Sequence, residues 1–312
     1  MVHALKFTYP DAEIDFLVNK RVFELVQDYP NINKVHAIEK DSLKDILRIC
    51  RVNKYDTAVI VKPLFVIALA VFLSRIKYRV GTAYRWYSFL FNLKHYQHRK
   101  YSVKHELEYN LDLLAELKCK RIEDIKPKLE VSGKLTEAVK EKILKKGIDF
   151  KKDFIIIHPG SLQSALRWKA ENFVELTDLL AKDETCKFNI LITGTKSDDV
   201  ILNSLAESVT GKDNIFIIND LGLKEFSVLC KLAKMFVSNS TGPIHIAAAV
   251  GTFCVGFYSP LRTESAVRWA PYTDKKRIFT PQIGEEKIKG DVMDEVEPGE
   301  VFAFIKNYML TN

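Results

Sequence analysis

The residues best suited to binding chemistry fall in one turn of the second half of the chain. An apolar run ends there, and the candidate binding residues are Asn239, Ser240, Thr241, Gly242, Pro243 and His245. Gly242 lets a ligand approach the backbone, while Pro243 suits the first turn of a helix, whose free N–H groups bind anions. In the plainer interpretation Asn239 is a simple N-cap and His245 an inert helix residue. Because hydroxyl, amide and imidazole groups meet at one turn, we favour a site for a phosphorylated ligand.

Two earlier turns carry related groups. The first follows the apolar run 154–158, and its candidates are His158, Gly160, Ser161 and Arg167. Small residues, a hydroxyl and backbone N–H groups can bind phosphate, although a polar turn with a capping serine explains them equally well. The second turn, Gly194-Thr195-Lys196-Ser197, lacks the upstream glycine of a P-loop. It therefore gives no support for ATPase chemistry, but it can still place Gly194 and Lys196 near a nucleotide.

Alternating apolar runs and amphipathic segments must position these turns. In the second half we expect strands at 154–158, 188–193, 214–218, 235–238 and 252–258, and helices at 170–182, 198–209, 223–233 and 243–250. Strands alternating with helices predict an α/β fold with a doubly wound parallel sheet. The first half shows the same alternation, so we expect two such domains, over 1–150 and 151–295, with a C-terminal helix at 296–312. Ligands of such sheets bind beyond the carboxyl ends of the strands, where the three turns lie.

Charge separates the two halves of the 312-residue chain. Residues 1–150 hold 28 basic and 19 acidic side chains, a net charge of +9, while the rest carries −2. No acidic residue lies between Asp56 and Glu106, a stretch that contains nine lysines and arginines. Such a surface attracts phosphates, acidic lipid headgroups or nucleic acid. No nucleic-acid-binding motif is present, so we expect no nucleic-acid partner.

Several classes of protein are excluded by composition. The five cysteines form no CxxC pair, which argues against a zinc site or a disulfide framework. No Asp-x-Asp pair that would hold a metal on a diphosphate is present, so we expect no metal and no cofactor. The longest apolar stretch, Pro63 to Leu73, has eleven residues, whereas a membrane-spanning helix needs about 20. The N-terminus lacks the pattern of a secretory signal.

Three segments resemble glycosyltransferase family 9, the bacterial heptosyltransferases of lipopolysaccharide core synthesis. They are His158-Pro-Gly-Ser with the later Trp168, the block from Ser238 through Thr241-Gly-Pro-Ile-His245 to Gly251, and Tyr9-Pro-Asp-Ala-Glu-Ile-Asp-Phe-Leu-Val18. The resemblance covers nearly the whole chain, and the Thr-Gly-Pro-x-His block is its most specific part. It implies a GT-B fold, in which two Rossmann-like domains face each other across a cleft and the C-terminal helix packs back toward the first domain.

The resemblance also implies an activity. Family members transfer a heptose from ADP-heptose, with inversion and without an obligatory metal, to the phosphorylated, lipid-linked inner core of lipopolysaccharide. They act in the cytoplasm at the inner face of the membrane, so a peripheral contact with anionic lipid is expected. The donor diphosphate would bind at the turns named above. The basic first half would bind the acceptor, with Lys62, Arg75, Arg79, Arg85 and Trp86 as candidates.

This sequence departs from the family pattern at its start and at two site positions. Family members begin with a strand and a glycine loop bearing the presumed catalytic aspartate, whereas Met1 to Pro10 matches only the end of the following helix. We therefore expect a chain that lacks its first strand, and we name no catalytic base. Leu166 and Ser240 stand where a lysine and an aspartate are frequent. The alternative functions are a truncated or vestigial protein that binds nucleotide-sugar without transfer and, less favoured, a nucleotide-sugar epimerase.

Overall fold

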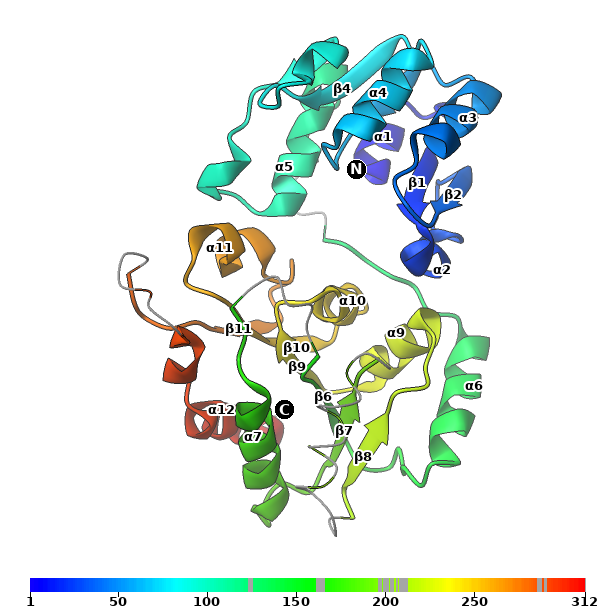
Figure 1. The fold of residues 1–312 in the computed structure, drawn as a ribbon. Coiled ribbons are helices and arrows are strands. Elements are labelled where there is room, and N and C mark those ends of the chain that lie inside the picture. The colour runs from blue at the N-terminus through cyan, green and yellow to red at the C-terminus, as the bar shows by residue number, and fades with distance from the viewer. Residues whose placement is uncertain are drawn as a thin grey trace. The chain divides into compact units, whose positions relative to one another are not determined.

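The chain divides into two compact units, Met1–Ile125 and Lys126–Asn312 (Figure 1). The structure, a computed structural model, describes all residues except 123–125, 161–165, 196–197, 199–201, 203–204, 206, 208–212, 285–287, 289–290 and 312. In both units every strand pairing described is parallel. Helices connect these strands, and the predicted α/β class is therefore confirmed.

The first unit contains two small parallel sheets. One pairs β1 (Asp15–Asn19) with β2 (Lys34–Ile38), and the other has the order β3-β4-β5, from Thr57–Val59, Tyr78–Thr82 and Leu93–His95. The α-helices are α1 (Val2–Thr8), α2 (Phe23–Val26), α3 (Leu43–Asn53), α4 (Phe65–Leu73) and α5 (Glu106–Asp112). Short 3-10 segments lie at Lys20–Val22, Ser88–Leu90, Arg99–Tyr101 and Leu113–Leu117. Helix α1 confirms the expectation that the chain begins with helix.

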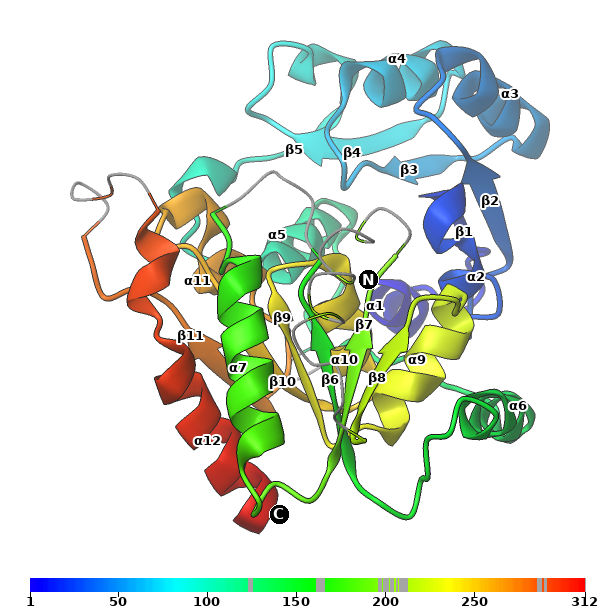
Figure 2. The ribbon, with the colours of Figure 1, turned by 60° about the horizontal axis from the view of Figure 1, so that its bottom comes forward.

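Helices α3 and α4 lie side by side on one face of the β3-β4-β5 sheet (Figure 2). The Ser42 hydroxyl caps α3 by accepting from the Asp45 N–H at 3.3 Å, and α3 ends at Lys54, whose φ of 49° is left-handed. Helix α3 buries Ile46, while α4 buries Ala68 and Val71 in the same core. The packing of α3 against α4 therefore stabilises this unit, in addition to the pairing of its strands.

The second unit is built on one six-stranded parallel sheet of order β11-β10-β9-β6-β7-β8. Its strands are β6 (Phe154–His158), β7 (Asn189–Thr193), β8 (Ile215–Ile218), β9 (Met235–Asn239), β10 (Phe253–Phe257) and β11 (Lys276–Phe279). Its helices are α6 (Gly133–Leu144), α7 (Ala170–Lys182), α9 (Leu223–Leu232), α10 (Gly242–Ala249), α11 (Ala266–Trp269) and α12 (Pro298–Thr311), with 3-10 segments at Arg262–Glu264 and Val292–Glu295. Helices α7 and α12 cover one face of the sheet, and α9 and α10 the other (Figure 2). This is the doubly wound arrangement that the sequence predicts.

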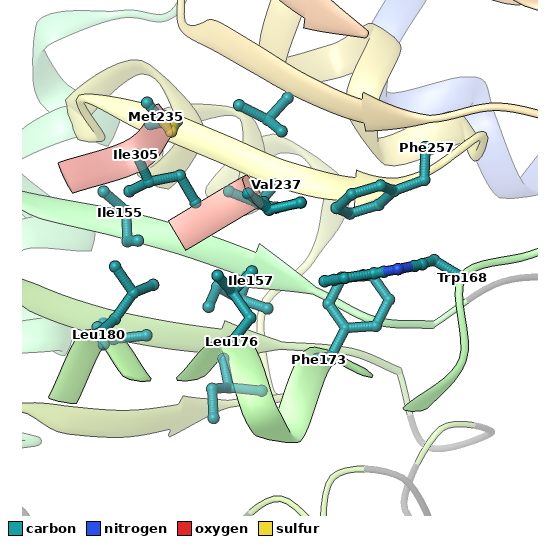
Figure 3. Packing of buried hydrophobic residues seen from close by; sticks show 14 of the residues in the cluster. Ile155, Ile157, Trp168, Phe173, Leu176, Leu180, Met235, Val237, Phe257 and Ile305 are labelled. Atoms are coloured by element: carbon teal, nitrogen blue, oxygen red, sulfur yellow. The ribbon is translucent and has the colours of Figure 1, made fainter. Parts of the chain in front are cut away.

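The main core of this unit lies between the sheet and helices α7 and α12 (Figure 3). The Trp168 ring stacks on Phe257 with centroids 4.1 Å apart and meets Phe173 edge-on at 4.8 Å. Its indole N–H donates to the Val296 carbonyl oxygen at 2.7 Å, so the buried polar group of this side chain is satisfied. Trp168 thereby fixes the end of the loop that follows β6.

Several boundaries differ from those expected. Helix α6 belongs to the second unit, because Lys142 contacts Glu225 and the Asp220 carbonyl, at 3.0 and 2.9 Å. Helix α12 contributes Val301 and Ile305 to the main core, and its Lys306 pairs with Asp183 at 2.6 Å. Its packing toward the first unit stays a prediction. Short β5 and β11 were not predicted, since strands of three and four residues give little periodicity. The helix expected at 198–209 falls largely outside the described residues.

Candidate functional site

The loops after β6 and β9 lie at the switch point of the six-stranded sheet. β6 and β9 are adjacent, with β7 and β8 continuing the sheet beyond β6, and β10 and β11 beyond β9. The connections therefore run in opposite directions from this pair, and in doubly wound sheets ligands bind at such a point, beyond the carboxyl ends of the strands. The predicted donor residues that the structure describes lie at the ends of β6, β7 and β9 or in the segments that follow these strands.

The turn between β9 and α10 presents its backbone and one hydroxyl. Thr241 is the N-cap of α10, and Pro243 follows in the first turn. The Thr241 Oγ1 atom is buried and has no hydrogen-bond partner among the described residues. A Cβ built on Gly242 would meet no described atom within 4 Å. The helix N-terminus therefore combines open space, free N–H groups and an unsatisfied hydroxyl, a combination suited to an anion.

The two residues before Thr241 have structural partners. Asn239 is 2% exposed, and both polar atoms of its side chain bind the backbone of Trp168. The Ser240 hydroxyl contacts the Tyr258 phenol, which donates to the Trp269 carbonyl oxygen at 3.1 Å. Burial raises the pKa of this phenol. Asn239 and Ser240 thus hold the turn in place.

His158, expected at the mouth of the site, is 6% exposed at the end of β6. Its Nδ1 atom lies 2.9 Å from the Thr193 hydroxyl of β7, and its ring stacks on Phe236. Burial lowers the pKa of His158 to about 4, and the nearby Asp198 carboxylate opposes that shift only in part. The imidazole is therefore neutral at pH 7 and packs beneath the site.

Asp198 is a site residue that the sequence reasoning missed. Its carboxylate accepts from the backbone N–H and the hydroxyl of Thr195 at 2.8 and 2.7 Å. A Cβ on Gly160 would lie 2.7 Å from the same carboxyl group, and one on Gly194 would lie 2.9 Å from Leu202. The Thr-x-x-Asp spacing of a capping box was the available signal. Ser161 and Lys196, two predicted donor residues, lie outside the described residues.

Arg167 and His245 complete the predicted donor set. The Arg167 side chain is exposed, next to the buried Trp168, and His245 lies partly buried in the first half of α10. Glu264, also missed, accepts from the Leu166 N–H at 3.2 Å and so ties the β6 loop to the segment after β10. A carboxylate in a short 3-10 segment gives no sequence signal for this role.

The five predicted acceptor residues separate into two groups in the first unit. Lys62 follows β3, and Arg85 and Trp86 follow β4, so these three lie at the carboxyl edge of the β3-β4-β5 sheet. Arg75 and Arg79 lie before and at the start of β4, at the opposite edge. The Arg79 guanidinium donates to the carbonyl oxygens of Leu90 and Ile76 at 2.9 and 2.5 Å. The Arg79 guanidinium therefore stabilises the backbone around β4.

The described residues form neither a metal-ligand cluster nor a membrane-spanning helix. Among the described residues, no three histidine, cysteine, aspartate or glutamate side chains gather closely enough to hold a metal ion. Within the same part of the chain, no helix is both long and apolar enough to cross a bilayer.

Comparisons with known proteins bear on the family and the fold of this chain. The model of glycosyltransferase family 9 (heptosyltransferase) matches residues 45–296. Lipopolysaccharide heptosyltransferase 3 of Escherichia coli is 21% identical over 291 residues, which cover 89% of this chain and 83% of that protein. A family 9 glycosyltransferase from Veillonella parvula superposes with a TM-score of 0.83 at 15% identity, covering 100% of this chain and 92% of that one. The Escherichia coli heptosyltransferase WaaC with ADP gives 0.72 at 16% identity, covering 98% and 93%.

These structures confirm the GT-B fold with its two parallel-sheet units. The expected absence of a first strand gains no support from coverages of 92% and 93% of the compared chains. The family model spans most of the chain, including the β6 loop and the Thr241-Gly242 turn. This chain therefore belongs to glycosyltransferase family 9.

Proposed function

We propose that this glycosyltransferase transfers a heptose from ADP-heptose, with inversion, to a phosphorylated lipid-linked saccharide of the lipopolysaccharide inner core. The heptosyltransferase named among its relatives supports the sugar, and the ADP in the WaaC structure supports the nucleotide. The acceptor chemistry places the reaction at the anionic inner face of the cytoplasmic membrane.

One observation carries the donor assignment: the Thr241 hydroxyl at the N-terminus of α10 is buried and has no hydrogen-bond partner in the part of the chain that the structure describes. A diphosphate oxygen would accept from this hydroxyl and from the N–H groups of the first helical turn. Sugar transfer leaves an additional negative charge on the diphosphate. Fixed donors aimed at that charge stabilise the transition state more than the ground state.

The acceptor assignment is narrower than the sequence suggested. Lys62, Arg85 and Trp86 share the carboxyl edge of the β3-β4-β5 sheet, where the two cations can pair with acceptor phosphate. Arg75 and Arg79 lie at the other edge. We assign the phosphates of the lipid-linked acceptor to Lys62 and Arg85.

Calorimetry with ADP tests the donor site directly. The change Thr241→Asp places a negative charge against the diphosphate and should weaken ADP binding at least about ten-fold. Thr136→Asp, a change of the same type in α6, is the matched control and should bind ADP like the parent. Equal binding by all three proteins would contradict the site assignment.

Transfer is tested with ADP-heptose and a panel of core acceptors. Formation of the heptosylated acceptor with the inverted anomer would support the full proposal. ADP binding without turnover on any acceptor would support the vestigial alternative. The use of another nucleotide-sugar in place of ADP-heptose would contradict the donor assignment and leave glycosyl transfer intact.

A further inference from the structure

Helix α4 carries an apolar face that its own unit covers only in part. The nine residues Phe65–Leu73 contain no charged side chain. Positions 65, 69, 72 and 73 share one helical face, and Phe72 and Leu73 on that face are 44% and 42% exposed. Large apolar side chains exposed together mark an interaction surface.

The opposite side of α4 is also apolar. Ala68, Ala70 and Val71 are buried against α3 and the sheet, so the exposed stripe is additional to the face that folding requires. A surface helix of a globular protein normally turns charged or polar residues outward. The composition of α4 therefore points to a partner that is itself apolar.

Aromatic rings and cations surround this stripe. The Trp86 side chain is 72% exposed, and its ring packs on Phe65 with centroids 4.7 Å apart. Arg79 lies over the Phe72 ring, 5.5 Å from its centroid. Exposed cations flank both ends of α4 and lie on the adjacent α3: Lys62, Arg85, Arg75, Lys77, Lys44, Arg48 and Arg51. Two of them are offset by carboxylates: Lys62 pairs with Asp41 at 2.8 Å, and Arg48 pairs with Asp45 at 3.8 Å.

We propose that α4 and Trp86 form a docking surface for an anionic lipid bilayer. The helix would lie in the plane of the interface, with Phe65, Phe72, Leu73 and Trp86 among the upper acyl chains. The surrounding cations would pair with lipid phosphates. The inference deepens the proposed function, on which it rests for one point: a lipid-linked acceptor must be met at a membrane.

Charge favours this occupant over a second copy of the chain. No acidic residue lies from position 57 to position 105, so two such faces brought together would repel each other. The affinity of the protein for an anionic membrane surface instead increases about five-fold for each lysine or arginine that comes close to the lipids. An interfacial tryptophan ring, here Trp86, is typical of proteins bound at this depth.

Vesicle sedimentation of the full chain tests the proposal. We expect binding to vesicles of phosphatidylethanolamine and phosphatidylglycerol, and little binding to phosphatidylcholine alone. The double change Phe72→Ser and Leu73→Ser should weaken binding at least about ten-fold, whereas Leu310→Ser, at a 60% exposed position of α12, should have no effect. Equal binding by the two variants would overturn the proposal.

Fluorescence locates the contact. Bound to vesicles, Trp86 should shift its emission to shorter wavelength, and brominated lipid chains should quench it. Trp86→Phe should remove that change. Unchanged Trp86 emission, or self-association that the double change abolishes without any vesicle binding, would overturn the proposal. ADP calorimetry on the parent chain distinguishes the membrane proposal from the proposed function. If the parent chain does not bind ADP, the proposed function is contradicted, while the vesicle result still stands.

Discussion

The side-chain amide of Asn239 binds both backbone polar groups of Trp168, 71 residues away in the sequence. Its Oδ1 accepts from the Trp168 N–H at 2.9 Å, and its Nδ2 donates to the Trp168 carbonyl oxygen at 3.1 Å. The end of β9 and the end of the β6 loop are thereby joined. Since Thr241 follows Asn239 by two residues, this contact fixes the donor turn against the central strand pair.

Replacing Asn239 with alanine should destabilise the protein strongly. The change leaves the buried N–H and C=O of Trp168 without partners, at a cost of about 2–4 kcal/mol. Urea unfolding followed by circular dichroism measures the effect. Asn307→Ala, at an exposed position of α12, is the control and should change stability little. A midpoint for Asn239→Ala equal to that of the control would show that the contact contributes nothing.

The elements of the second unit were largely predictable, whereas the roles of its side chains were not. Helix α7 has the expected bounds, Ala170–Lys182, because apolar residues such as Phe173, Leu176 and Leu180 recur along it at helical spacing. His158 and Asn239 were predicted from residue type and position in a turn. Their partners, Thr193 and Trp168, come from other strands and loops, and no local pattern contains that information.

In the first unit, too, the sequence predicted the kind of residue but not where its charged side chains lie. The acid-free stretch predicted an anionic partner, and the residues within it were treated as one set. The fold separates them, since Lys62 and Arg85 lie at one edge of the sheet and Arg75 and Arg79 at the other. The apolar run Pro63 to Leu73 was considered as a membrane span and excluded by its length. The exposed face of α4 can be identified only in the structure, where packing against the core shows which side of the helix is buried.

Replacing Thr241 with valine should separate binding from stability. Valine keeps the shape of the side chain and removes a buried hydroxyl for which the described residues offer no partner, so the ligand-free protein should be at least as stable as the parent. ADP should bind about ten-fold more weakly, because one hydrogen bond to a charged oxygen is lost. Thermal unfolding and calorimetry measure the two effects. A destabilised protein with unchanged ADP affinity would mean that the hydroxyl serves the fold.

Gly160→Ala should act through Asp198. The new Cβ would lie 2.7 Å from the Asp198 carboxyl group, which must then leave Thr195, at a cost of about 1–3 kcal/mol. In an Asp198→Ala background the clash is absent, so the same glycine change should cost much less. A double-mutant cycle with urea unfolding gives the coupling between the two residues. Additive effects would contradict the contact between Gly160 and Asp198.

Acid should destabilise the protein through His158. Burial holds the pKa of this imidazole at about 4 in the folded state, against 6.5 in an unfolded chain. The unfolded state therefore binds more protons between pH 6.5 and 4, and the free energy of unfolding should fall by up to about 3 kcal/mol as the pH drops through that window. Above pH 6.5 the contribution is complete and constant.

The variant His158→Gln tests the assignment of this slope, because glutamine can still bond to the Thr193 hydroxyl but does not titrate. Its stability should vary less with pH between 6.5 and 4 than that of the parent, while His3→Gln, at an exposed position, should keep the parental slope. Urea unfolding at a series of pH values gives both curves. If His158→Gln retained the full slope, the loss of stability in acid would have to come from other groups. Four carboxyl groups also have pKa values below the usual 3.8 in the folded protein: Asp15, Asp183, Asp220 and Asp274. The stability that they contribute is lost in more acidic solution, below about pH 3.8, and can therefore be distinguished from the effect of His158.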